Sequence, residues 1–182
     1  MSIEFGETRP SNGPSAFVMS VVLPEGRLAV GWQHASATCE FLGETFATRH
    51  AKTGRDYSDA RHSIIYLVNE LIENAIKFRS PGDIEIRCSL EEGNFELVVT
   101  NNASSEVATR FQAILAEVTA GDPGELLIQR IEANAADENS SASGLGILTL
   151  MNDYGARLGW TFTEAPAGGT VTLSTFASLS LN

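Results

Sequence analysis

The spacing of apolar and turn-forming residues predicts an α+β fold, a two-layer α/β sandwich with helices packed on one face of a mixed, mostly antiparallel sheet. Residues 58–79 carry the strongest helical periodicity in the chain. Residues 84–90 and 95–100 alternate around a turn, and residues 157–163 and 170–176 repeat this hairpin pattern. Strands and helices do not alternate one for one, so the pattern does not favour a regular βαβ winding.

The N-terminal part of the chain is expected to extend this sandwich. We expect residues 1–15, which contain two prolines, to be a flexible lead-in. Residues 16–55 then form a strand–helix extension. It consists of two strands over 16–23 and 27–31, followed by an amphipathic helix over 36–50.

We expect residues 104–143 to form a lid-like insert between the two hairpins. Apolar residues spaced for a helix occupy 107–118. The run 122–125 (Asp-Pro-Gly-Glu) combines an N-cap, a proline in the first turn and a reach-back glutamate, which predicts the start of a second short helix. The polar tract 135–143 has no apolar periodicity, and we expect it to be mobile before a helix over 147–154.

The composition fits one globular domain over residues 16–182 of an acidic protein. The chain has 182 residues and a net charge of −11, and no cluster of basic residues interrupts it, so nucleic-acid binding is not expected. No apolar run reaches the length of a membrane helix, and the N-terminus does not resemble a secretory signal. Cys39 and Cys88 form neither a disulfide framework nor a zinc motif, which favours a reducing, cytoplasmic setting.

A polar stripe on the predicted helix 58–79 is the first chemical signal. At 3.6 residues per turn, Glu70, Glu73, Asn74 and Lys77 lie on one narrow side of the helix, opposite its apolar residues. A solvated face with a Glu73–Lys77 pair is one interpretation. Asn74, however, is a poor residue for a helix interior because its amide competes for backbone hydrogen bonds, so it indicates a specific partner.

Residues 69–78 (NELIENAIKF) resemble the first conserved box of the histidine-kinase-like ATPase superfamily, the GHKL or Bergerat-fold group. The resemblance implies that Glu70 activates or orients a nucleophile. It also implies that Asn74 ligates a Mg²⁺ ion on the phosphates of ATP and that Lys77 approaches those phosphates. These residue types suit the roles, since a tuned carboxylate can act as a base and a neutral amide oxygen is a hard magnesium ligand.

The second box of the superfamily is degenerate here. After the strand 95–100, Asn101 stands where the resemblance expects an aspartate that accepts a bond from the adenine amino group. Both glycines of the box are absent from the residues that follow, Asn102-Ala103-Ser104. An amide oxygen can accept that bond but carries no charge, so the bond is weaker. An ordinary turn at the end of the strand is the alternative interpretation of Asn101 and Asn102.

The third box and the closing strand come later in the chain. The resemblance places Gly144, Leu145, Gly146 and Ile147 at the nucleotide. Glycines let the backbone approach phosphates, and a helix N-terminus offers free N–H groups, which matters in an acidic protein. Residues 168–173 resemble the closing strand, whose Thr170 would reach the adenine pocket, although a glycine-rich hairpin turn explains them equally.

The small size and the N-terminal extension are most similar to bacterial anti-sigma-factor serine kinases and SiaB-like kinases. This resemblance implies a Ser/Thr protein kinase of the partner-switching type that uses Mg-ATP on a STAS-like anti-anti-sigma partner, with a homodimer as a further option. Two alternatives stay open. One is a module of the same fold that binds nucleotide weakly or not at all and sequesters a regulator, and the other is an ATP hydrolase that uses a lid as a switch.

Overall fold

The computed structural model describes residues 2–25, 32–52, 56–136, 145–164 and 169–181. The described strands are β1 (Ser2–Gly6), β2 (Phe17–Leu23), β3 (Ile84–Glu91), β4 (Asn94–Ser104), β5 (Arg157–Glu164) and β6 (Thr170–Ser180). The described helices are α1 (Trp32–Ala51), α2 (Tyr57–Phe78), α3 (Ser105–Val118), α4 (Pro123–Ala136) and α5 (Leu145–Asn152). The expected α+β class is confirmed.

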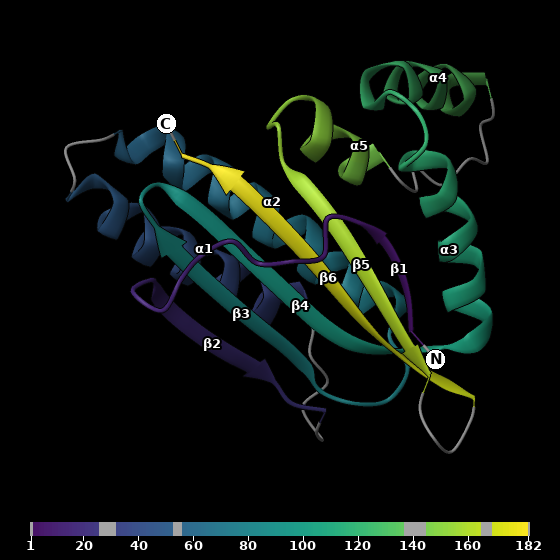
Figure 1. Ribbon diagram of the computed structural model, residues 1–182, viewed down its shortest axis with the longest axis horizontal. Helices are drawn as coiled ribbons and strands as arrows, with labels where there is room; N and C mark the ends of the chain where they lie inside the picture. The colour runs from purple at the N-terminus through teal and green to yellow at the C-terminus, as the bar shows by residue number, and fades with distance from the viewer. Residues whose placement is uncertain (1, 26–31, 53–55, 137–144, 165–168, 182) are drawn as a thin grey trace.

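The strands form one sheet in the order β1-β5-β6-β4-β3-β2 (Figure 1). Every pairing among the described strands is antiparallel, which corrects the expected mixed sheet. The pairing of β2 with β3 is antiparallel because two helices, α1 and α2, connect these strands. Each helix reverses the direction of the chain, so β3 enters the sheet opposite to β2. The long β4–β6 ladder keeps one continuous register, so alternate residues of both strands share a face.

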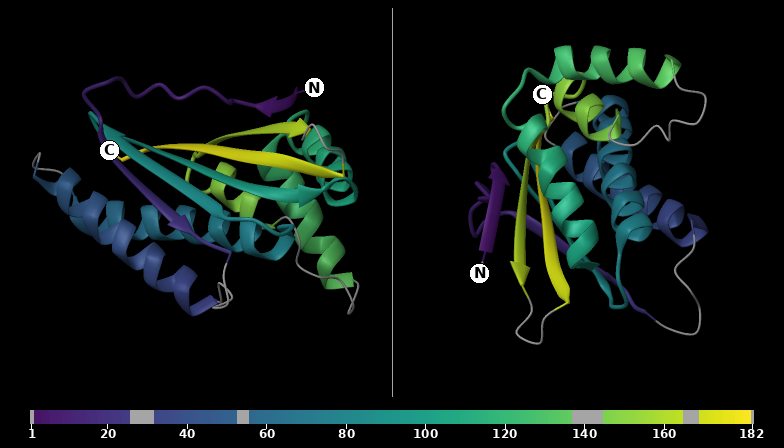
Figure 2. Two further views of the ribbon diagram at one scale, coloured as in Figure 1. Left: turned by 90° about the horizontal axis from the view of Figure 1, so that it is seen from below. Right: turned by 90° about the vertical axis from the view of Figure 1, so that its right-hand side faces the viewer.

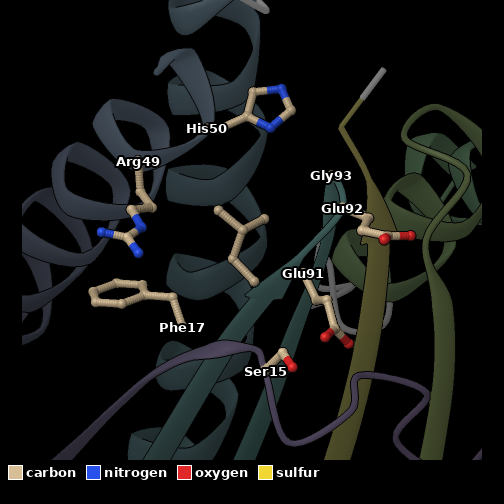
Figure 3. A pocket seen from close by; sticks show the side chains of 8 residues that line it. Ser15, Phe17, Arg49, His50, Glu91, Glu92 and Gly93 are labelled. Carbon is tan, nitrogen blue, oxygen red and sulfur yellow. The ribbon is translucent and has the colours of Figure 1, made fainter. Parts of the chain in front are cut away.

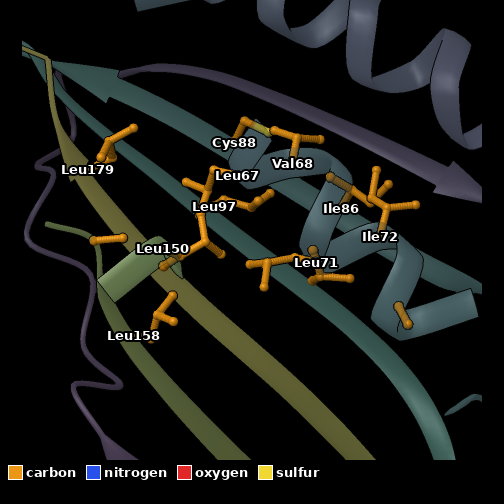
Figure 4. Close-up of a cluster of buried hydrophobic side chains, with 14 of the residues drawn as sticks. Leu67, Val68, Leu71, Ile72, Ile86, Cys88, Leu97, Leu150, Leu158 and Leu179 are labelled. Carbon is orange, nitrogen blue, oxygen red and sulfur yellow. The ribbon is translucent and has the colours of Figure 1, made fainter. Parts of the chain in front are cut away.

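The helices cover one face of the sheet, while the N-terminal segment lies on the other (Figure 2). Figure 4 shows the resulting core, in which apolar side chains of α2 and α5 meet those of β3, β4, β5 and β6. Leu67, Ile72 and Leu97 are fully buried there. This burial fixes α2 on the sheet and leaves its polar stripe on the side that faces away from the core.

The N-terminal lead-in is more ordered than we expected over residues 1–15. Residues 2–6 form the edge strand β1, which pairs with β5. Ser11 and Asn12 bind the carboxylate of Glu96 on the outer face of the sheet through their backbone N–H groups. The sequence analysis did not predict the contacts of Ser11 and Asn12, because Glu96 lies more than eighty positions further along the chain.

Several expected elements are confirmed with shifted ends. Strand β2 and helices α1 to α5 lie where periodicity placed them, and Asp122 caps α4 by accepting a bond from the N–H of Glu125 at 2.9 Å. The expected strand 27–31 and most of the polar tract 135–143 lie outside the described residues. None of the described helices is long and apolar enough to span a membrane.

Candidate functional site

Helix α2 presents the predicted polar stripe as expected. Asp56 caps its N-terminus by accepting bonds from the N–H groups of Ser58 and Asp59 at 2.7 and 3.2 Å. The apolar half of the helix is buried against the sheet, while Glu70, Glu73 and Asn74 are only half-buried and Lys77 is exposed. The stripe therefore remains available to a ligand or to a neighbouring element.

Helix α5 and the residues just after it lie along α2 and reach the first residue of this stripe, Glu70. Residues 62 and 66 of α2 contact Tyr154, just after α5, whereas Glu70 contacts Gly146 in its first turn. Since the contacts on α5 run backwards as those on α2 run forwards, the two helices are antiparallel. The N-terminus of α5 therefore points along α2 toward Asn74 and Lys77. Free N–H groups and the positive end of the helix dipole favour an anion at such a position.

Gly146 leaves room for the carboxylate of Glu70. A Cβ atom on this residue would lie 1.8 Å from Oε2 of Glu70, so any side chain would displace the carboxylate. The glycine thus allows a close approach between the backbone of α5 and a charged group of α2. Two residues that the sequence joined only through a resemblance are brought together by the fold.

The Glu70 carboxyl sits in an unfavourable environment for a negative charge. Burial raises its pKa, and the nearby negative charge of Glu73 raises it further. No hydrogen bond or ion pair to the Glu70 carboxylate is found within the described part of the chain. Glu73, in contrast, accepts a hydrogen bond from the Asn69 amide at 2.9 Å. A half-buried acid with a raised pKa and no such partner is a candidate for proton transfer.

Asn74 and Lys77 extend the stripe beyond the first turn of α5. The side chain of Asn74 makes no hydrogen bond to any residue that the structure describes, so its amide oxygen is available. The Lys77 ammonium lies 5.1 Å from the ring centre of Phe78, a weak cation–π contact that an anion could replace. One buried side-chain nitrogen of Arg79, at the C-terminal cap of α2, also finds no acceptor in the described ranges.

The residues of the third box serve two purposes. Ile147 is buried in the core and anchors α5 to the sheet, whereas Leu145 and Gly146 are half-buried at the helix start. Gly144, expected to approach the phosphates, lies outside the described residues. The described part of this box therefore positions the helix end beside Glu70.

The residues expected to bind the base are divided between the two faces of the sheet. Asn101 is buried on the helix face, and its side-chain amide donates to the carbonyl of Asn102 at 3.1 Å. Asn102 points to the outer face, where it accepts a bond from the Thr172 hydroxyl at 3.4 Å. Thr170 pairs with Ser104 and shares the outer face with Thr172, so it does not face Asn101. The alternative interpretation of Asn101 and Asn102, a turn at the end of the strand, is wrong, because β4 continues to Ser104.

Asn102 also holds the end of α2 in place. Its carbonyl accepts the N–H of Ser80 at 2.7 Å, and its side chain donates to the carbonyl of Pro81 at 3.4 Å. Gly82, with φ 139°, leaves room for that side chain, since a Cβ there would lie 2.5 Å from Nδ2 of Asn102. These contacts give Asn102 a structural role.

The donor set at the stripe fits magnesium bound mainly through nucleotide phosphates. Magnesium is typically held by one or two protein oxygens together with phosphates and water. The free amide oxygen of Asn74 could supply one such ligand. The described residues contain no group of three or more His, Cys, Asp or Glu side chains that could hold a metal ion by themselves. The ion would therefore depend on the nucleotide.

Two surface hollows lie away from the stripe. Figure 3 shows the first, where Arg49 lies over the ring of Phe17 at 4.9 Å and Glu91 lies across the hollow. The second lies at the start of α2, and its lining includes Ser58, His62 and Tyr154. Neither includes Glu70, Asn74 or Lys77, and the first combines both signs of charge without a bias toward anions.

Two residues beside the site were missed by the sequence analysis. Tyr66 lies one helical turn before Glu70, and its ring stacks on Tyr154, just after α5, with ring centroids 4.7 Å apart. Extending the stripe backwards by four positions would have found Tyr66. No signal in the sequence points to Tyr154, since its contact with Tyr66 depends on how α5 docks.

Comparisons with known proteins define the fold. No protein-family model matches the chain. No curated protein matches its sequence either. Among solved structures, it is similar to a chain in the crystal structure of the SiaB–SiaC complex from Pseudomonas aeruginosa, with a TM-score of 0.62 and 12% identity. The match covers 87% of this chain and 89% of that chain. At this identity the similarity shows a SiaB-like fold.

Proposed function

We propose that this protein binds Mg-ATP along the polar stripe of α2 and acts as a Ser/Thr protein kinase of the partner-switching type. The observation that carries the proposal is the contact between Gly146 and Glu70. It sets the N-terminus of α5, which favours phosphates, beside an acid with a raised pKa. Asn74 and Lys77 follow on the same stripe.

Each residue of the stripe has a distinct chemical role in this proposal. Glu70 orients the hydroxyl of the protein substrate and accepts its proton, and a raised pKa brings a carboxylate closer to the operating pH of a base. The substrate oxygen bonds to the γ-phosphorus as the bond to the β–γ bridging oxygen breaks, and ADP leaves. Lys77 offsets charge on the phosphates, and the amide of Asn74 would hold magnesium. The bound ion would neutralise phosphate charge.

The proposed substrate is a small STAS-like regulatory partner. Two observations support a partner of this kind. The first and third boxes resemble those of the histidine-kinase-like ATPase superfamily, and the N-terminal strand–helix extension is most similar to anti-sigma-factor serine kinases. The chain also shares its fold with a chain from a complex of two proteins, SiaB and SiaC. We therefore infer that the phosphoryl group is transferred to a Ser or Thr of a regulator rather than to water.

Calorimetry with ATP and magnesium tests the binding step. We expect measurable heat for the wild-type chain, and Asn74→Ala and Lys77→Ala each to weaken binding about tenfold through loss of a charge-assisted contact. Lys52→Ala is the matched control, because Lys52 is exposed at the end of α1 and far from the stripe in sequence. The absence of heat at millimolar nucleotide would contradict the proposal.

Transfer of radiolabelled phosphate to a co-encoded STAS-like protein tests the chemical step. Glu70→Gln keeps the size of the side chain and removes the base, so we expect transfer to fall by about a hundredfold or more. Glu85→Gln is the matched control, since Glu85 is an exposed glutamate on β3 and lies outside the stripe. Equal transfer by wild type and Glu70→Gln would exclude the role given to this acid.

The residues expected to bind the adenine, Asn101 and Thr170, support a second candidate function. This function is a non-catalytic module that sequesters the partner. Asn101 has no negative charge, and its amide nitrogen is already bound to Asn102. Thr170 lies on the opposite face of the sheet. Tight partner binding without nucleotide heat or phosphate transfer would favour this function over the kinase.

A further inference from the structure

Strand β2 (Phe17–Leu23) is an edge of the sheet that carries no charge and no proline. Among the described strands it pairs only with β3, so the backbone groups along its other side have no partner strand there. Its seven residues are Phe-Val-Met-Ser-Val-Val-Leu. Such an edge is a template for pairing with another strand, which proteins commonly prevent with charged residues or proline.

The opposite edge of the sheet is protected in this way. Strand β1 lies at that edge (Figure 1), and Glu4 occupies the middle of its five residues. Glu7, just after β1, forms an ion pair with Arg157 at 3.3 Å. The two edges of one sheet therefore differ, and only β2 lacks a charge that would oppose a second strand.

We propose that β2 pairs with β2 of a second copy of this chain, antiparallel and centred on Ser20. The two six-stranded sheets then form one continuous sheet. A twofold axis at Ser20 places every residue of β2 opposite a residue of the same strand, which is the isologous contact of a C2 dimer. This inference does not depend on the proposed function.

The register centred on Ser20 matches the exposed apolar residues of β2. Val18 and Val22 are 39% and 52% exposed, and they lie on the outer face of the sheet, two residues on either side of Ser20. In this register Val18 of each copy lies opposite Val22 of the other. Cross-strand pairs of β-branched residues stabilise a sheet, whereas a shift of two residues would place a valine opposite Ser20.

The helix face of β2 is apolar as well. Phe17, Met19 and Val21 are only partly buried against the core of their own chain. In the same register Met19 lies opposite Val21 of the second copy, so pairing covers this second apolar row. Both faces of the new strand pair are then apolar around the central Ser20.

Helix α1 adds an exposed aromatic residue beside this edge. Phe41, Thr45 and Arg49 are four residues apart and share one side of α1. Arg49 lies over the ring of Phe17 in β2 at 4.9 Å, so this side of the helix is turned toward the edge (Figure 3). Phe41 is 54% exposed there and offers further apolar surface to a second copy.

Charged residues do not oppose the contact locally. On the outer face the charges next to β2 are Glu85 and Arg87 of β3, opposite Val22 and Ser20. In the dimer two β2 strands separate each of them from β3 of the second copy. This is about 14 Å, which exceeds the screening length of about 8 Å at physiological salt. Each copy carries a net charge of −11, however, so long-range repulsion remains and salt should strengthen the dimer.

Sedimentation velocity of the nucleotide-free full-length chain tests the proposal. We expect a species of 39 kDa, twice the 19.5 kDa of one chain. The contact involves one strand and one side of α1, at the low end of specific interfaces, so we expect a dissociation constant on the order of 10 µM. Raising the salt from about 50 mM to about 500 mM should lower this constant severalfold.

Two double variants test the register. Val18→Lys with Val22→Lys places like charges opposite each other at both positions, and we expect it to raise the dissociation constant by about a hundredfold or more. Val18→Glu with Val22→Lys places opposite charges there and should keep the constant within about tenfold of wild type. Both valines are exposed, so the variants should fold, as circular dichroism checks.

Ile3→Lys is the matched control, because Ile3 is a 42% exposed residue of the other edge strand, β1. It should leave the dissociation constant unchanged. A wild-type chain that stays monomeric at about 100 µM and high salt would overturn the inference, given the expected constant. Equal dissociation constants for the two double variants would overturn it too.

Hydrogen exchange identifies the occupant of the edge. We expect the amides of residues 17–23 to become more protected as the protein concentration rises, since a second copy covers them. Protection that does not depend on concentration would show that another segment of the same chain covers β2, and would overturn the inference. None of these measurements uses ATP or phosphate transfer, so a failure of the proposed function and a failure of the dimer are distinguishable.

Discussion

Glu96 is a buried acid on the outer face of the sheet, and Glu70 is a half-buried acid on the helix side. The surroundings of the two carboxyl groups differ sharply. The Glu96 side chain is 3% exposed on the outer face. Its carboxylate accepts bonds from the N–H and hydroxyl of Ser11 at 2.6 and 2.7 Å and from the amide of Asn94 at 3.2 Å. Glu70 is half-buried on the helix side, and burial raises its pKa.

The comparison separates a structural acid from a candidate catalytic acid. Buried charges are retained in proteins when hydrogen bonds compensate their desolvation, as around Glu96. Glu70 lacks that compensation among the described residues, and a glycine of α5 lies directly against it. An acid that the fold buries without stabilising its charge points to a role in chemistry. The four predictions below follow from this contrast, from the largest expected effect to the smallest.

Loss of Glu96 should have the largest effect on stability. Glu96→Ala leaves the donors of Ser11, Asn12 and Asn94 without an acceptor, and we expect a loss of about 3 kcal/mol in the free energy of unfolding. Urea denaturation measures this loss. Glu85→Ala, an exposed glutamate on the adjacent strand, is the control and should change stability by less than about 0.5 kcal/mol. Similar losses in both variants would refute the structural role of Glu96.

Gly146→Ala should damage the site more than the fold. The new Cβ would displace the flexible end of Glu70, so we expect a loss of about 1 kcal/mol in stability but a large loss of phosphate transfer. Gly43→Ala is the contrasting variant, because its Cβ would lie 2.2 Å from Cγ1 of Ile65 between α1 and α2. It should destabilise more, as seen in thermal unfolding, without altering the site. A larger loss of stability in Gly146→Ala than in Gly43→Ala, with a smaller loss of phosphate transfer, would contradict the close approach of Gly146 to Glu70.

Removing the charge of Glu70 should change stability slightly and in a direction set by pH. The folded state raises the pKa of Glu70, so it binds more protons than the unfolded state between the two pKa values. The contribution of Glu70 to stability is therefore fully present below the unfolded pKa and is lost as pH rises through the folded pKa. Relative to Glu70→Gln, the wild type should lose stability across that window in urea denaturation at a series of pH values. A gain with rising pH would show that the carboxylate is stabilised instead.

Glu73→Gln should have the smallest effect, a modest fall in two pKa values. Burial is the main cause that raises the pKa of Cys39 to about 12, and the charge of Glu73 is the second. The same charge contributes to the raised pKa of Glu70. We expect both to decrease while remaining above their ordinary values, because burial persists. The rate of thiol alkylation against pH and NMR of the Glu70 carboxyl measure these shifts.

Much of the fold could be predicted from local patterns in the sequence. The period of 3.6 residues in α2, the alternation in β3 and β4 and the cap at Asp122 are short-range signals that local physics makes reliable. The same periodicity placed Glu70, Asn74 and Lys77 on one side of α2. Edge strand β1 carried no such signal, because its pairing with β5 depends on a partner distant in the chain.

Tertiary structure alone decided which of the polar residues share a site. The register of β4 against β6 places Thr170 on the face away from Asn101, and no local pattern reveals a register between strands so distant in sequence. The docking of α5 brings Gly146 to Glu70 and Tyr154 to Tyr66 through a core of apolar contacts. The sequence determined the helices, the hairpins and the chemistry available on α2. Packing between distant segments determined which of those groups meet, because burial, unlike helix periodicity, is a property of the assembled chain.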